Sequence, residues 1–209
     1  MKKPAFVVTA LVGVYVALQL IADVTAVKIV EVAGVTLPAA TFIFAITFTW
    51  RDMIHKRLGR EWARAAIWTA AIANVGMALY FVFVINLPSA VFWGNQEALA
   101  AILGVVPRIT IASILAELVS ELLDTEVYHW LVERIPTRHQ WARVLGSNAI
   151  SLPVDSIIFV GFAFGGTMPV AALVSVAVGQ IVFKGLVTLV SLPLIYAVPE
   201  RPILAVGGD

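Results

Sequence analysis

The sequence lacks cysteine throughout its 209 residues, which excludes disulfide bonds and thiolate metal sites. Charge is also scarce: 13% of the residues are charged, whereas soluble domains carry roughly 25%. The net charge of +1 gives no reason to expect a nucleic-acid partner. Apolar residues make up 61% of the chain, and its mean hydropathy is +0.96. A soluble core of this size cannot bury such a composition, so we expect a protein of the lipid bilayer.

The hydrophobic residues form continuous runs instead of alternating with polar ones, which disfavours a β-barrel. Residues 32–50 and 65–87, for example, contain no charged side chain. Each run is long enough to cross roughly 30 Å of hydrocarbon as a helix. Pro107 is expected to separate a short outer piece, residues 98–106, from the span that follows. The sequence thus predicts one all-α transmembrane domain, residues 1–209, with six spans at about 5–27, 32–50, 65–87, 108–132, 144–166 and 169–198.

The distribution of basic residues predicts how the spans are oriented. With the N-terminus in the cytoplasm, eleven of the 14 basic residues fall on the cytoplasmic side: Lys2, Lys3, Arg51, Lys56, Arg57, Arg60, Arg64, Arg134, Arg138, Arg143 and Arg201. This asymmetry favours an N-in, C-in topology. Arg51, Asp52 and Arg60 are then expected in the loop between the second and third spans, where their alternating charges would have a positioning or gating role.

Small residues recur at every fourth position of the first span, at Ala5, Thr9, Gly13 and Ala17. Such a stripe allows another helix to approach closely. The partner is either a helix of this chain or one from another protein, and a second copy of the chain would make a homo-oligomer.

Ionisable and amide side chains inside the spans identify a candidate binding site, because each is costly in lipid and must face the protein interior. Their spacings of three and four residues place them on one face of each helix. Helical rise places Glu117, Asp155 and Gln180 about 14–16 Å from the span ends, near the midplane. The set comprises Glu117, Glu121 and Asp124 in the fourth span, Asn148 and Asp155 in the fifth, and Gln180 and Lys184 in the sixth.

These spans hold more acids than bases, since Arg108 and Lys184 are the nearby intramembrane cations. The excess negative charge must be protonated, hydrated or matched by a cationic ligand. Catalysis is not expected, because His55, His129 and His139 lie at or outside the cytoplasmic boundary. The same absence of an intramembrane histidine disfavours a metal site, and no cofactor is expected.

Three strings resemble those of the queuosine-precursor transporter family, also called the vitamin uptake transporter family. They are residues 50–60 (WRDMIHKRLGR), 120–125 (SELLDT) and 147–159 (SNAISLPVDSIIF). The resemblance extends from about Ala17 to Lys184. One departure is Asp23, where the family motif more often has asparagine, so the resemblance assigns no role to this residue.

The resemblance implies a multi-pass importer in the bacterial inner membrane. Its substrates would be 7-cyano-7-deazaguanine or 7-aminomethyl-7-deazaguanine, which serve tRNA modification. It also implies a six-helix fold like that of the substrate-binding subunits of energy-coupling-factor transporters, but acting without the ATPase module. The alternative is a subunit of that kind, for a vitamin or purine-like ligand, that needs a separate energising complex.

A deazaguanine ligand fits the chemistry of the polar residues. A carboxylate can accept both adjacent N–H donors of its guanine-like edge. Asn148, Gln180 or Lys184 could donate to the ring carbonyl, and Phe159, Phe162 or Trp93 could stack on the base. The candidate substrate-binding residues are Glu117, Glu121, Asp124, Asn148, Asp155, Phe159, Gln180 and Lys184.

Overall fold

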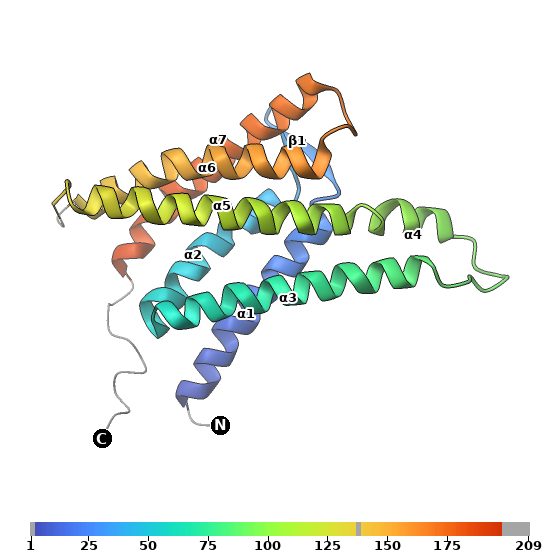
Figure 1. The fold of residues 1–209 in the computed structure, drawn as a ribbon, viewed down its shortest axis with the longest axis horizontal. Helices are drawn as coiled ribbons and strands as arrows, with labels where there is room; N and C mark the ends of the chain where they lie inside the picture. The colour runs from blue at the N-terminus through green and yellow to red at the C-terminus, as the bar shows by residue number, and fades with distance from the viewer. Residues whose placement is uncertain (1–2, 137–138, 198–209) are drawn as a thin grey trace.

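The computed structural model describes residues 3–136 and 139–197, which form a helical bundle with one β-hairpin (Figure 1). Within these ranges the elements are α1 (Lys3–Thr25), β1 (Ile29–Val32), β2 (Val35–Pro38), α2 (Thr41–Leu58), α3 (Arg60–Ile85), α4 (Gln96–Leu103), α5 (Val106–Val132), α6 (Gln140–Phe164) and α7 (Val170–Ala197). The predicted all-helical class is confirmed, apart from the hairpin.

Five runs in the described part of the chain are long and apolar enough to cross a membrane: Phe6–Thr25, Glu61–Ile85, Gln96–Asp124, Trp141–Phe164 and Val170–Val190. Helix α2 is not among them, because five of its last eight residues (Arg51, Asp52, His55, Lys56 and Arg57) are polar or charged. The structure therefore supports a multi-pass membrane protein and five of the six expected spans.

The start of the second predicted span, residues 32–50, is wrong. Strands β1 and β2 pair antiparallel from Ile29 opposite Pro38 to Val32 opposite Val35. The turn between them is formed by Ala33 and Gly34, both at positive φ (53° and 78°), as a type I′ hairpin turn requires. The β-branched residues on either side favour strands over a helix. Helix α2 consequently begins only at Thr41 and continues to Leu58, beyond the predicted end.

The expected break near Pro107 is present: α4 ends at Leu103 and α5 begins at Val106. Pro107 itself lies in the first turn of α5, where its missing N–H donor costs nothing. The other helices start or end within a few residues of the predicted spans, and the largest difference is that α3 starts at Arg60 instead of residue 65.

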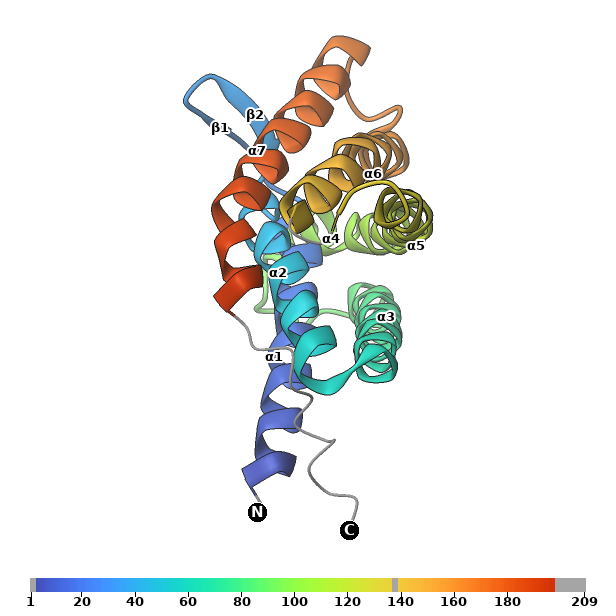
Figure 2. The same cartoon turned by 90° about the vertical axis from the view of Figure 1, so that its left-hand side faces the viewer.

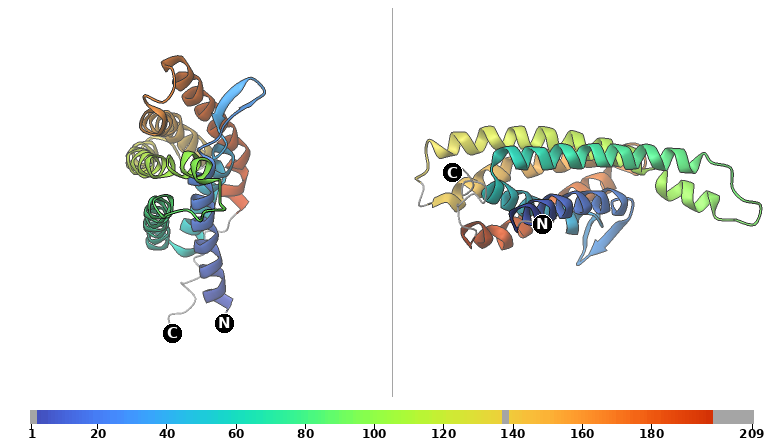
Figure 3. Two further views of the ribbon diagram at one scale, coloured as in Figure 1. Left: turned by 90° about the vertical axis from the view of Figure 1, so that its right-hand side faces the viewer. Right: turned by 90° about the horizontal axis from the view of Figure 1, so that it is seen from below.

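The helices form two layers (Figure 2): α3, α5 and α6 lie side by side, and α1, α2 and α7 cover them. The α2–α3 and α5–α6 connections lie toward one end of the bundle, and the hairpin and the α6–α7 connection toward the other. At this second end the α3–α4 connection extends beyond the other helices (Figure 3). Basic residues of the first end include Arg57, Arg64 and Arg134, so the arrangement is compatible with the expected topology.

Small side chains form much of the interior, as is common where membrane helices approach closely. Ala22, Ala112, Ala116 and Ala163 belong to the core between α1, α5, α6 and α7. The predicted small-residue stripe of α1 is not part of this core, because Thr9, Gly13 and Ala17 are exposed. The side chain of Ala5 lies outside the described residues.

The closest approach of helix and hairpin occurs at Gly179 of α7. A Cβ atom there would lie 2.0 Å from the carbonyl oxygen of Thr36 and 3.0 Å from a methyl group of Val35. Gly185, on the same helix, has nothing within 4 Å of the equivalent position. Only glycine therefore allows α7 to lie against β2.

We predict that Gly179→Ala destabilises the protein by about 1–3 kcal/mol, the usual cost of overpacking. Gly185→Ala is the matched control, since its added methyl group meets open space. The measurement is the unfolding temperature of both variants in detergent. Equal unfolding temperatures for the two variants would show that the hairpin is not pressed against α7.

Candidate functional site

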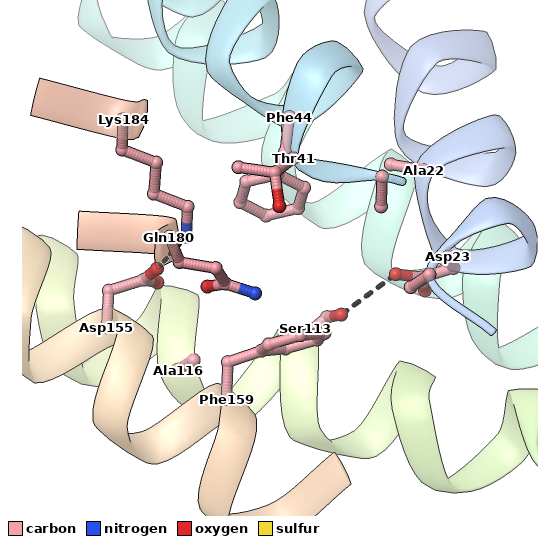
Figure 4. Close-up of a pocket in the computed structure, with 12 residues that line it drawn as sticks. Ala22, Asp23, Thr41, Phe44, Ser113, Ala116, Asp155, Phe159, Gln180 and Lys184 are labelled. Atoms are coloured by element: carbon pink, nitrogen blue, oxygen red, sulfur yellow. Dashed lines mark hydrogen bonds and ion pairs between the residues drawn. The ribbon is translucent and has the colours of Figure 1, made fainter. Parts of the chain in front are cut away.

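A cavity of about 340 Å³, counting the space at its mouth, lies between α1, α2, α5, α6 and α7 (Figure 4). We call it the central cavity. Its lining consists of Ala22, Asp23, Ala26, Ala40, Thr41, Phe44, Ser113, Ala116, Asp155, Phe159, Gln180 and Lys184. Four of the predicted site residues are among them: Asp155, Phe159, Gln180 and Lys184.

One wall of the central cavity carries a buried ion pair between α6 and α7. The Nζ atom of Lys184 donates to Oδ2 of Asp155, and the two side chains are 4% and 3% exposed. The other carboxylate oxygen of Asp155 accepts a hydrogen bond from Ser120 at 3.3 Å. Lys184 also lies 5.1 Å from the ring centre of Phe44, within cation–π range. Asp155 and Lys184 thus neutralise each other.

Three polar atoms at the central cavity have no hydrogen-bond partner among the described residues. Asp23 is 1% exposed, and its Oδ1 accepts from Ser113 at 2.8 Å. The Thr110 hydroxyl also acts on this carboxylate, but Oδ2 has no partner of hydrogen-bond geometry among the described residues. The Thr41 hydroxyl and the Gln180 amide oxygen are likewise buried and unpaired. Leaving such an atom unpaired costs about 1–3 kcal/mol. The three groups, from α1, α2 and α7, therefore offer hydrogen bonds that a ligand can complete.

Aromatic and small apolar side chains complete the central cavity. Phe44 and Phe159 face the cavity from α2 and α6, and Phe159 packs edge-on against Phe164 at 5.9 Å. The other predicted stacking residues lie elsewhere: Phe162 is 57% exposed and Trp93 is 38% exposed, in the α3–α4 connection. The cavity therefore combines aromatic faces with unpaired polar atoms.

A second cavity of about 280 Å³, which we call the inner cavity, lies nearer the α2–α3 and α5–α6 end. Its lining consists of Arg51, Ser120, Asp124, Asn148, Ser151, Leu152 and Asp155. Ser151 donates to Oδ1 of Asp124 at 3.0 Å. The predicted residues Asp124 and Asn148 belong to this inner cavity, and Asp155 lines both cavities.

The expectation that Arg51 acts in a loop is wrong. Helix α2 continues seven residues beyond Arg51 before Gly59, at a φ of 93°, ends it. Arg51 therefore lies inside the bundle and adds a cation to the acids of the site. The side chains of Asp52 and Arg60 lie outside the described residues.

Arg108 was counted among the intramembrane cations in the predicted charge balance. It is exposed and donates to the carbonyl oxygens of Phe162 and Gly165.

Glu117 does not line either cavity. Its carboxylate accepts hydrogen bonds from Tyr15 at 3.1 Å and from Gln19 at 3.4 Å, both on α1. The charge of Arg51 also acts on it. Glu117 thus joins α1 to α5 beside the cavities. The side chain of Glu121, another predicted site residue, lies outside the described residues.

Sequence reasoning missed Asp23, Thr41 and Arg51. Asp23 was visible as an acid inside an apolar span, but the family pattern gave it no role. Thr41 and Arg51 were misplaced because the second helix was expected at residues 32–50; it starts later and ends later. No group of three metal-ligating side chains is found among the residues described, which gives no support to a metal centre.

Apolar helices around buried polar cavities define a class of protein: a multi-pass membrane protein that can hold a small polar molecule between its helices. The chain belongs to the family described as "Putative vitamin uptake transporter", which residues 38–198 match. This confirms the resemblance seen in the sequence, and a transporter family is consistent with the expectation that the chain is not an enzyme.

A relative supports the same assignment. Over 177 residues the chain is 30% identical to a protein of Bacillus subtilis (strain 168) described as "Probable queuosine precursor transporter". The aligned region covers 84% of this chain and 77% of that protein. No solved structure matches the chain significantly.

The buried ion pair leads to a test of its structural role. We predict that Lys184→Met lowers the free energy of unfolding by about 3–5 kcal/mol, because it leaves the buried charge of Asp155 uncompensated. The double variant Asp155→Asn with Lys184→Met should recover part of this loss. Thermal unfolding in detergent measures both. A double variant less stable than Lys184→Met alone would contradict the pairing.

Proposed function

We propose that the protein imports queuosine precursors, 7-cyano-7-deazaguanine or 7-aminomethyl-7-deazaguanine, across the bacterial inner membrane for tRNA modification. The observation that carries this proposal is the central cavity, where unpaired atoms of Asp23, Thr41 and Gln180 lie beside Phe44 and Phe159. The printed name of the Bacillus subtilis relative supports the choice of ligand.

Asp23 is the best carboxylate for recognising the guanine-like edge. The ring N–H and the neighbouring amino group are adjacent donors, and a carboxylate can accept from both. Both oxygens of Asp155 are already occupied by Lys184 and Ser120, whereas Oδ2 of Asp23 has no partner among the described residues. The structure thus favours Asp23 over the Asp155 of the sequence-based hypothesis.

Gln180 and the two phenylalanines suit the rest of the ring. The Gln180 amide can donate to the ring carbonyl or accept from a ring N–H, and it faces the same space as Asp23. Stacking on Phe44 or Phe159 would add about 1–3 kcal/mol per base by analogy with other aromatic platforms. Lys184 and Asp155 then form the charged wall of the site, and Glu117 remains a predicted support behind it.

Charge distinguishes the two candidate substrates. The ammonium group of the aminomethyl compound is on the far edge of the ring from the N–H groups that Asp23 accepts, so it does not contact Asp23. Its charge is still attracted to Asp23 within the buried cavity, whereas the cyano compound is neutral. Lys184 is paired with Asp155, so it does not neutralise Asp23 directly. We therefore propose the aminomethyl compound as the tighter ligand.

We predict that Asp23→Ala weakens binding of either precursor by about tenfold or more, since hydrogen bonds to a charged group contribute about 1.5–3 kcal/mol. A ligand lacking the exocyclic amino group, 7-deazahypoxanthine, tests the contact itself. The native protein should discriminate between it and 7-deazaguanine, and Asp23→Ala should lose that discrimination. Isothermal titration of purified protein measures both.

Thr25→Ala is the matched control, two residues further along α1. Among the described residues, its hydroxyl bonds only to carbonyl oxygens of its own helix, at Ile21 and Ala22. If Asp23→Ala still bound 7-deazaguanine more tightly than 7-deazahypoxanthine, another group would have to contact the exocyclic amino group.

The alternative function, a substrate-binding subunit of an energy-coupling-factor transporter, is favoured by one observation. Thr9, Gly13 and Ala17 expose small side chains on α1, where an energising complex could dock. We expect instead that the protein works alone. When it is expressed by itself in a host that lacks such complexes and cannot make queuosine, supplied precursor should restore the modified tRNA. Restoration only after a partner complex is added would establish the alternative.

A further inference from the structure

The central and inner cavities follow one another along the same helices. On α5, Ser113 and Ala116 line the central cavity, whereas Ser120 and Asp124 line the inner one. From Ser113 to Asp124 the helical rise amounts to about 16 Å. Helix α6 contributes Phe159 to the central cavity and Asn148 to the inner one. The two cavities therefore lie at different positions along the axes of α5 and α6.

The partition between the two cavities is the side chain of Asp155, which lines both. Lys184 holds one of its oxygens from α7, and Ser120 holds the other from α5. All three residues are buried, with exposed fractions of 2–4%. A ligand that moves from one cavity to the other must pass this carboxylate.

The inner cavity shares three kinds of polar group with the central one, although no aromatic side chain among the described residues lines it. The central cavity offers a carboxylate, an amide and a cation, in Asp23, Gln180 and Lys184. The inner cavity offers the same three kinds of group in Asp124, Asn148 and Arg51. Acceptors for ring N–H groups and donors for a ring carbonyl are thus present in both.

We infer that the inner cavity is a second binding station for the same purine-like ligand, and that the Asp155–Lys184 pair separates the stations. Arg51 donates to the ring carbonyl there and Asp124 accepts from a ring N–H. The ligand crosses when Asp155 and Lys184 part, and their charges are then met by groups of the ligand. This inference rests on the proposed function, because it assigns the imported molecule to the inner cavity.

Two kinds of measurement test the inner station. Asp124→Asn should lower the initial rate of 7-aminomethyl-7-deazaguanine uptake by about tenfold, the cost of one hydrogen bond to a charged group. Equilibrium binding, which the central cavity dominates, should change far less. Leu122→Ala is the matched control: it lies two residues earlier on α5 and is 63% exposed. A parallel loss of binding and uptake in Asp124→Asn would overturn the inference.

The absence of cysteine allows a second measurement that does not depend on uptake. Ala116→Cys places a thiol in the central cavity and Leu152→Cys places one in the inner cavity. Each is made in the full-length protein, and labelling by a small methanethiosulfonate is followed with and without 7-aminomethyl-7-deazaguanine. The ligand should slow labelling at both positions, and Asp155→Asn should increase the protection at Leu152→Cys.

The results separate this inference from the proposed function. Protection at Ala116→Cys without any at Leu152→Cys, in the native and Asp155→Asn backgrounds, would overturn the second station and leave the importer intact. Failure of the native protein to bind either precursor would instead refute the proposed function. Protection at both positions, together with the selective uptake defect of Asp124→Asn, would establish two stations.

Discussion

The ion pair of Asp155 and Lys184 is the constraint on which the interior depends. Two charges buried among apolar helices are tolerable only when they neutralise each other, and this pair ties α6 to α7 with the help of Ser120 from α5. Because this pair neutralises its own charges, the buried atoms left unpaired at the central cavity among the described residues belong to other groups. Asp23 and Gln180 can therefore form hydrogen bonds with a ligand without breaking the Asp155–Lys184 ion pair beside them.

Glu117 is a second acid inside the bundle whose hydrogen bonds are made to other side chains of the protein. Its carboxylate accepts hydrogen bonds from Tyr15 and Gln19, so this acid, predicted as a ligand or a direct support for one, also joins α1 to α5. Membrane helices have little hydrophobic driving force for association, and such contacts and small side chains hold them together. Acids inside this fold thus either join helices or face a cavity, and the hydrogen-bond partners of each acid show which of the two it does.

Spacing and depth in the sequence predicted much of the site. Asp155 and Gln180 were expected near the midplane, with Lys184 on the same inward face as Gln180, and the three meet at the central cavity. What periodicity could not supply was which helix faces which, because rotation and tilt depend on packing between segments distant in the chain. The roles of Asp23 and Arg51 depend on that packing. The hairpin at residues 29–38 was missed because its apolar, β-branched residues also suit a membrane span.

The contact of Gly179 with Thr36 has a mechanical consequence for the central cavity. Gly179 is followed directly by Gln180, and β2 leads through a short connection to Thr41. Two ligand-facing groups from different helices are therefore attached to the contact between α7 and the hairpin. A displacement of the hairpin at the surface would move both groups relative to Asp23 on α1, so the position of the hairpin sets the shape of the site.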